Sequence, residues 1–158
     1  MTAEYRVLTD REFDLLWDRN QAADPQEPMW PVWRQRFRQR IESGQAISFG
    51  VILDGDPVGE GTLELNTGKD PRLCDGKNNA YLAALRIRKE FEGQGHISRL
   101  VKTMENHARN LGFSAITIGV EEAEARNRAI YAHWGYVNLL FAIREDGEQV
   151  LYYGKNLK

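Results

Sequence analysis

Residues 85–100 of this chain of 158 residues read Leu85-Arg86-Ile87-Arg88-Lys89-Glu90-Phe91-Glu92-Gly93-Gln94-Gly95-His96-Ile97-Ser98-Arg99-Leu100. They predict a strand, a glycine turn and the start of a helix, because a β-like run leads in and apolar residues at helical spacing follow. The first turn of a helix has unpaired backbone N–H groups and attracts anions. Glycines at positions 93 and 95 let the backbone approach a ligand closely. The stretch therefore predicts a phosphate-binding turn.

Two other nucleotide-binding motifs fit this turn poorly. A Walker P-loop needs Lys and then Ser or Thr after its last glycine, where this chain has His96 and Ile97. A dinucleotide fingerprint needs a third glycine, where this chain has Ser98. Neither ATP nor NAD is favoured, and the remaining alternative is that the glycines only make a tight turn.

The rest of the chain predicts one mixed α/β domain over residues 1–158. The expected order is β-α-α-β-β-β-α-β-α-β-β, with helices packed on a largely antiparallel sheet and one βαβ crossover. Strands are expected at 5–8, 46–53, after the turn 54–57 as far as 65, and at 81–87, 115–120, 137–143 and 149–157. Helices are expected after Asp10 as N-cap and at 32–41, 95–111 and 124–134. The segment 66–79 is expected to be a loop that borders a site.

Composition and charge narrow the class of protein. The net charge is −2 and no basic stripe is present, so nucleic acid is not an expected partner. Cys74 is the one cysteine, which excludes an intrachain disulfide and fits a reducing compartment. The first ten residues lack the apolar stretch of a signal peptide, and no apolar run approaches the roughly 18 residues of a membrane span. We expect a cytoplasmic protein.

Two segments resemble motifs of the GNAT N-acetyltransferases. Residues 85–100 resemble motif A, whose glycine turn binds the pyrophosphate of CoA in that family. Asn127-Arg128-Ala129-Ile130-Tyr131-Ala132-His133-Trp134-Gly135-Tyr136 resembles motif B, with its tyrosine shortly before a Gly-aromatic pair. The resemblance covers residues 81–136. It implies the GNAT fold, with a mostly antiparallel sheet of roughly six or seven strands, about four helices and a central acyl-CoA-binding crossover, and it implies acetyl-CoA as co-substrate.

The resemblance also implies which residues bind CoA. Backbone groups of Leu85 and Ile87 would pair with the pantetheine arm as if it were another strand. The diphosphate would lie on the turn formed by Gly93, Gln94, Gly95, His96, Ile97 and Ser98. Glu92 stands where the family usually has a basic or amide residue, and Ile97 where it has a small one, so backbone donors would hold the diphosphate. Relatives often have an asparagine where this chain has Glu124. Asn127, three residues later, would take the place of that asparagine.

Acyl transfer to an amine needs a neutral amine, a stabilised oxyanion and a proton for the leaving thiolate. Tyr131 matches the family's general acid, and a phenol can protonate or hydrogen-bond a thiolate; ring packing is the alternative role. The backbone N–H of Ile87 is the implied oxyanion donor. Glu64 is the candidate base, acting through water, with Glu60 and Glu121 as alternatives.

Two surfaces are candidates for the acceptor site. Glu60, Thr62 and Glu64 share one face of a strand, which either lines a cleft for a cationic acceptor or is simply solvated. The segment 29–33, Met-Trp-Pro-Val-Trp, is placed in a loop by its prolines and either covers the acceptor pocket or packs in the core.

No metal site is expected. The histidines at 96, 107 and 133 are dispersed, and each is expected on a helix surface.

These features favour an N-acetyltransferase that passes an acetyl group from acetyl-CoA to a primary amine by direct transfer in a ternary complex. Cys74 lies in a loop far from both motifs and suits no covalent relay. The acceptor could be an aminoglycoside, a polyamine, an amino acid or a protein amine. The alternative is a non-catalytic acyl-CoA-binding module of the same fold. A homodimer is expected through the strand around residues 151–154, since a sheet edge needs covering.

Overall fold

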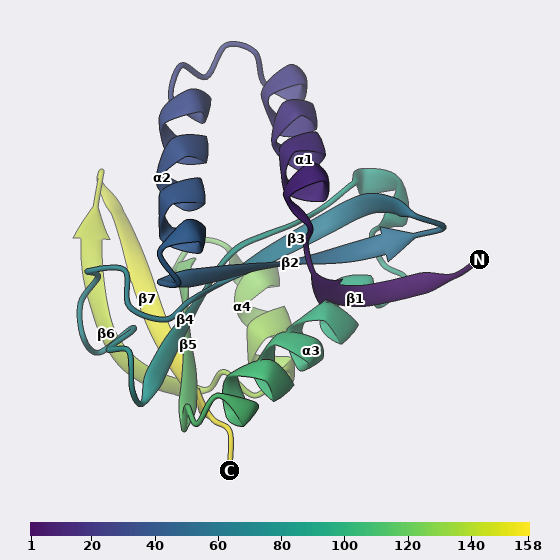
Figure 1. The fold of residues 1–158 in the computed structure, drawn as a ribbon. Coiled ribbons are helices and arrows are strands. Elements are labelled where there is room, and N and C mark those ends of the chain that lie inside the picture. The colour runs from purple at the N-terminus through teal and green to yellow at the C-terminus, as the bar shows by residue number, and fades with distance from the viewer. The chain divides into compact units, whose positions relative to one another are not determined.

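The computed structural model describes residues 1–158 (Figure 1). Its elements are β1 (Ala3–Val7), α1 (Asp10–Ala23), α2 (Trp30–Glu42), β2 (Ala46–Leu53), β3 (Asp56–Glu64), β4 (Asn79–Ile87), a 3-10 turn (Lys89–Phe91), α3 (His96–Asn110), β5 (Ala115–Glu121), α4 (Ala125–His133), β6 (Asn138–Glu145) and β7 (Glu148–Asn156). The predicted order of strands and helices is confirmed. None of the helices has the length and apolar character needed to cross a membrane.

A 7-stranded sheet carries the fold, with neighbouring strands in the order β1-β2-β3-β4-β5-β7-β6. Strand β4 pairs in parallel with β5, whereas β1 with β2, β5 with β7 and β6 with β7 pair antiparallel. The parallel pair is connected through α3, because parallel strands need a crossover. The structure therefore confirms the mostly antiparallel α/β fold with one βαβ unit.

The chain forms two compact units. The first comprises Met1–Leu63 and Ala84–Met104, and the second comprises Glu64–Ala83 and Glu105–Lys158. The core of the first unit includes the buried side chains of Phe13, Leu16, Trp17, Phe49, Val51 and Leu63. The core of the second includes those of Leu82, Ile116, Ile118, Val120 and Leu151.

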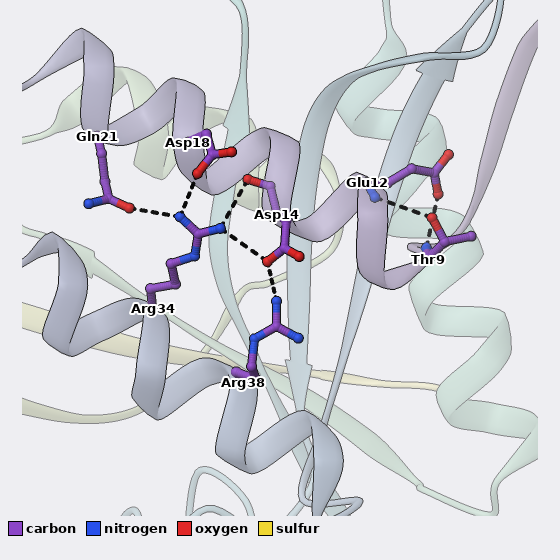
Figure 2. A network of polar contacts seen from close by, with 7 residues as sticks. All are labelled: Thr9, Glu12, Asp14, Asp18, Gln21, Arg34 and Arg38. Carbon is purple, nitrogen blue, oxygen red and sulfur yellow. Dashed lines mark hydrogen bonds and ion pairs between the residues drawn. The ribbon is translucent and has the colours of Figure 1, made fainter.

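Helix α1 begins at a capping box (Figure 2). The Thr9 hydroxyl accepts from the Glu12 N–H at 3.2 Å, and the Glu12 carboxylate accepts from the Thr9 N–H at 2.9 Å. Two otherwise unpaired backbone donors are satisfied in this way. The prediction of Asp10 as the N-cap is therefore wrong by one residue. Asp10 instead places a negative charge in the first turn, where the helix dipole favours it.

Helices α1 and α2 lie side by side and are joined by ion pairs (Figures 1 and 2). Arg34 donates to Asp18 Oδ1 at 2.7 Å and to Asp14 Oδ1 at 3.0 Å. Arg38 donates to the same oxygen of Asp14. Arg34 and Arg38 together hold the pKa of Asp14 below its usual range, with the Arg34 hydrogen bond the largest cause. Since these groups are partly exposed, each pair contributes about 0–1 kcal/mol, and their effect is mainly to fix the two helices together.

The segment 29–33 does not form the predicted loop. Helix α2 begins at Trp30, and Pro31 stands in its first turn, where the missing N–H removes no helical hydrogen bond. The Trp30 ring contacts Trp17 and Trp33, at centroid distances of 5.8 and 5.3 Å. Aromatic packing between α1 and the start of α2 therefore explains these residues.

A tight hairpin joins β2 to β3. Asp54 and Gly55 have positive φ values of 48° and 82°, which match the type I′ turn that suits the twist of paired strands. The turn is shorter than predicted because Asp56 and Pro57 already belong to β3.

The second unit contains a partly buried ion pair with a third partner. Lys155 Nζ lies 3.0 Å from both carboxylate oxygens of Glu105, and the Tyr136 hydroxyl donates to Glu105 at 2.9 Å. Burial is the main cause that raises the pKa of Tyr136 above its usual range, and the Glu105 carboxylate adds to it. The network links α3, β7 and the residues after α4 within this unit.

The strand that ends the sheet is β6, and the prediction that residues 151–154 occupy the edge is wrong. Strand β7 lies between β5 and β6, and its Leu151 side chain is buried. Exposed apolar side chains gather instead on and beside β6, at Val137, Leu139, Leu140 and Ile143. The chain order of two adjacent antiparallel strands does not reveal which one is outermost, and this accounts for the error.

Candidate active site

Strand β4 changes its backbone geometry in the middle. Its ladder with β5 covers Asn79–Leu82 and does not include Leu85 or Ile87. Ala84 follows the ladder with φ 56°, a conformation that an alanine within a strand adopts at a cost on the order of 1–3 kcal/mol. Such an irregularity re-aims the strand, and strands are often irregular in this way next to binding sites. The two residues predicted to pair with the pantetheine arm thus lie within three residues after a strained position.

The glycine turn has the backbone conformation that its sequence predicts. Gly93 and Gly95 have φ values of 75° and 83°, which residues with a side chain rarely adopt. The Arg99 N–H bonds Gly95 O at 3.1 Å and begins the helical hydrogen bonding, so the preceding N–H groups have no helical partner. A Cβ on Gly93 would meet no atom within 4 Å, so the backbone there is open. The turn therefore fits a diphosphate held by main-chain donors.

Arg99 brings a positive charge to this turn, which sequence reasoning missed. Its Nη1 donates to the Gln94 carbonyl at 3.2 Å and lies 3.3 Å from the position of a Cβ on Gly95. The side chain is exposed and so can move toward a bound anion. The sequence could have indicated this role, because Arg99 lies in the first turn of α3 and side chains of a helix point back toward its N-terminus, where the glycine turn lies.

His96 is not on the surface, contrary to the prediction. Its side chain is buried, and Nδ1 lies 2.8 Å from the Tyr5 hydroxyl. The imidazole therefore anchors the start of α3 to β1, and only the backbone N–H of this residue remains for a ligand. Ile97 and Ser98 follow it, each half-buried, in the first helical turn.

The polar face of β3 is buried. Glu60, Thr62 and Glu64 are exposed by only 4%, 2% and 2%, so the interpretation as a solvated sheet face is wrong. In the second unit, Lys69 Nζ lies 3.9 Å from Glu64 Oε2 and 5.5 Å from the centroid of the Tyr81 ring. A carboxylate can accept a proton, so Glu64 stays the candidate base. Glu121, the other candidate in this unit, is exposed.

Tyr81 links the polar residues of the second unit and was not predicted. Burial is the first cause that raises the pKa of its phenol above the usual range, and the charges of Tyr152, Glu64 and Tyr131 raise it further. A Cβ on Gly119 would lie 3.0 Å from the Tyr81 hydroxyl. Glu64 and Tyr131 therefore each lie close enough to Tyr81 to raise its pKa. The apolar run around Tyr81 gave no sign of a polar role.

Helix α4 carries the other predicted site residues. Tyr131 is half-buried, and its ring lies 5.6 Å from that of Trp134. Burial raises the pKa of Tyr131 above its usual value, and the Glu124 charge adds to this effect. The phenol therefore stays protonated at neutral pH. Asn127, one helical turn earlier, donates its amide to Glu124.

Comparison with known proteins agrees with this geometry. The sequence model of the Acetyltransferase (GNAT) family matches residues 9–136. No curated protein matches the chain in sequence. Among solved structures, an N-acetyltransferase from Staphylococcus aureus Mu50 matches with TM-score 0.75 and 13% identity over 100% of both chains.

Two further structures share the fold. The ribosomal-protein-S18-alanine N-acetyltransferase from Escherichia coli matches with TM-score 0.75 and 13% identity, over 99% of this chain and 95% of that one. PaiA N-acetyltransferase from Thermoplasma acidophilum, in complex with coenzyme A, matches with TM-score 0.69 and 16% identity over 99% of both chains.

The chain therefore belongs to the GNAT family of acetyltransferases. It is an acyl-CoA-dependent N-acyltransferase, and acetyl-CoA is the co-substrate of this family.

Proposed function

We propose that the protein transfers the acetyl group of acetyl-CoA directly to a primary amine in a ternary complex. The observation that carries this proposal is that the second unit holds a half-buried phenol, Tyr131, and a buried carboxylate, Glu64, and that both raise the pKa of the Tyr81 phenol. The two groups supply a proton donor and a proton acceptor, which is what thioester aminolysis needs. Cys74 is buried beside Thr67, which argues against a covalent acyl-cysteine step.

The cofactor is held mainly by the backbone in this proposal. The N–H groups of the turn from Gly93 to Ser98 bind the diphosphate, and the positive end of α3 favours its charge. Leu85 and Ile87 pair through their main chain with the pantetheine arm, beyond the last residue of the β5 ladder. Arg99 adds a positive charge at the turn.

The chemical steps assign one role to each catalytic residue. Glu64 takes a proton from the acceptor ammonium through a water, and the neutral amine nitrogen attacks the thioester carbon. A C–N bond forms, and the electron pair of the carbonyl moves to its oxygen, for which the family resemblance implies the Ile87 N–H as hydrogen-bond donor. The C–S bond then breaks, its electron pair leaves on sulfur, and Tyr131 gives sulfur its proton. The electron pair on the oxyanion re-forms the carbonyl as the C–S bond breaks, and the second amine proton returns to Tyr131 through solvent. Glu64 releases its proton to solvent, so the products are the amide, the CoA thiol and one proton.

The test is a screen of primary amines followed by CoA release, with Glu64→Gln as the key variant. At neutral pH we expect Glu64→Gln to lower kcat/KM by roughly 10²-fold, because the amine remains protonated without the base. The loss should shrink as pH rises, since the amine then deprotonates in solution. Glu121→Gln, which changes an exposed carboxylate, is the matched control and should keep wild-type rates. An unchanged pH profile in Glu64→Gln would exclude the assigned role.

We also propose a homodimer through β6. This strand ends the sheet, and Val137 and Leu139 next to its start are 62% and 58% exposed. An edge strand with apolar side chains is a place where a second copy can add. Light scattering should give the mass of two chains, and Leu139→Lys should return it to one. A monomer mass for the wild type would remove this proposal.

A further inference from the structure

Arg86 is a positively charged side chain in the first unit to which the proposed mechanism gives no role. It lies on β4 between Leu85 and Ile87, so its side chain points to the opposite face of the strand from theirs. The guanidinium carbon lies 5.5 Å from the Trp17 ring centroid and 5.4 Å from that of Trp30. Cation–π contacts of this kind fix the place of a guanidinium without using its N–H donors.

One donor of Arg86 is buried without a hydrogen bond. Its Nε has no hydrogen-bond partner, and Oε2 of Glu60, with which it forms an ion pair, is 3.6 Å away. That distance is beyond the normal range for an N–H···O bond. Two other arginines of the same unit differ: Arg19 reaches Asp56 at 2.8 Å and Arg34 reaches Asp18 at 2.7 Å. A buried donor without a partner is costly, and such a group is often completed by a ligand.

Glu60 does not offer a site for a cation. Its side chain is 6% exposed and accepts from Asn20 Nδ2 at 3.0 Å. Its negative charge faces the Arg86 guanidinium at 3.6 Å. Arg86 itself is 36% exposed, so a ligand can reach the guanidinium while Glu60 remains covered. The accessible charge of this cluster is therefore positive.

The surroundings of Arg86 are held in place by the paired helices. Trp17 belongs to α1 and Trp30 to α2, and the ion pairs of Figure 2 join these two helices. A guanidinium whose position is fixed in advance loses less entropy when it binds a planar anion. A carboxylate suits it best, because its two oxygens match two parallel N–H groups.

We propose that the acceptor is a primary amine that also carries a carboxylate, and that Arg86 binds this carboxylate. The inference rests on the proposed function, since Ile87, the next residue along β4, is the assigned oxyanion donor. Among the acceptor classes that the sequence left open, it selects amino acids and acidic peptides over polyamines and aminoglycosides. Arg86 determines specificity and takes no part in proton transfer.

The experiment compares acceptors that differ only in the carboxylate, such as an amino acid and its amide, with spermidine as a cationic acceptor. We expect the wild type to acetylate the carboxylate form with the highest kcat/KM, by about 10-fold or more over the amide. The double variant Arg86→Gln/Glu60→Gln avoids leaving Glu60 unpaired. In this variant the ratio of kcat/KM for the carboxylate acceptor to kcat/KM for the amide should fall close to one, chiefly through a change in KM. The affinity for acetyl-CoA, measured by calorimetry, should stay unchanged.

Arg88→Gln is the control, because Arg88 lies on the same segment and is bonded to Glu90. It should keep the wild-type ratio. Preference for spermidine in the wild type, or an unchanged ratio in the double variant, would overturn the inference.

A second readout separates this inference from the proposed function. Carboxylate binding at Arg86 should change the tryptophan fluorescence, because Trp17 and Trp30 flank the guanidinium. We expect the change with amino-acid ligands in the wild type and its loss in the double variant. If no amine is acetylated, the proposed function fails, but this titration still decides the role of Arg86. If amino-acid ligands do not change the tryptophan fluorescence of the wild type, the inference is overturned.

Discussion

The Tyr5 hydroxyl lies 2.8 Å from His96 Nδ1 and joins β1 to the first residue of α3. Tyr5→Phe keeps the ring but leaves the buried imidazole without this partner. We expect the free energy of unfolding to fall by about 0.5–1.5 kcal/mol. Acetyl-CoA should also bind more weakly, because His96 belongs to the diphosphate turn. Denaturant titration and calorimetry measure the two effects, and wild-type values for both would show that the contact does not position the turn.

Gly95→Val tests the diphosphate site. Acetyl-CoA should raise the melting temperature of the wild type, because it binds the native state. The variant should fold but lose this shift, since its branches crowd the turn and Gly95 has φ 83°. Gly147→Val is the matched control, with similar strain at φ 81° in the turn between β6 and β7. Equal acetyl-CoA shifts in the two variants would place the phosphates elsewhere.

The sequence was sufficient to predict the order of elements and the diphosphate turn, because both depend on local signals. Period and glycine placement identify strands, helices and positive φ without knowledge of tertiary contacts. Pro31 led to the wrong prediction of a loop for a similar local reason, since a proline is compatible both with a loop and with the first turn of a helix.

Burial and strand order could not be predicted in this way. The alternation of Glu60, Thr62 and Glu64 shows that they share a face of the strand. Whether that face is exposed to solvent depends on the helices and loops that pack on it. The position of β7 inside the sheet depends on which strand β5 pairs with, and no residue of β7 encodes this alone. The contact of Arg86 with Trp17 and Trp30 joins segments distant in the chain, so it was visible only in the fold.

Glu12→Gln should make stability less dependent on acid pH. Hydrogen bonds from Arg6 are the main cause that lowers the pKa of Glu12 from 4.5 to about 2. A carboxyl whose folded pKa is depressed stabilises the protein above its unfolded pKa, and this contribution is lost as pH falls toward the folded value. The variant should therefore be less stable by about 1–2 kcal/mol at neutral pH. The difference should disappear between pH 4.5 and 2.

Denaturant titrations across that range measure this effect. Glu4 is the other carboxylate that pairs with Arg6, and its side chain is 51% exposed. Glu4→Gln should therefore change stability much less. A difference for Glu12→Gln that grows as pH falls would contradict the assignment.

The central claim is that the Tyr131 hydroxyl acts on the leaving sulfur in the chemical step. Tyr131→Phe keeps the ring against Trp134 and removes only the hydroxyl, so its effect reports on that group alone. The raised pKa of Tyr131 predicts that its deprotonation causes no loss of rate at neutral or mildly alkaline pH. The decisive measurement is kcat of Tyr131→Phe with a confirmed acceptor, at saturating substrates and with chemistry rate-limiting, alongside the Kd of acetyl-CoA. We expect kcat to fall by roughly 10²-fold with little change in Kd, whereas a wild-type kcat would contradict the claim.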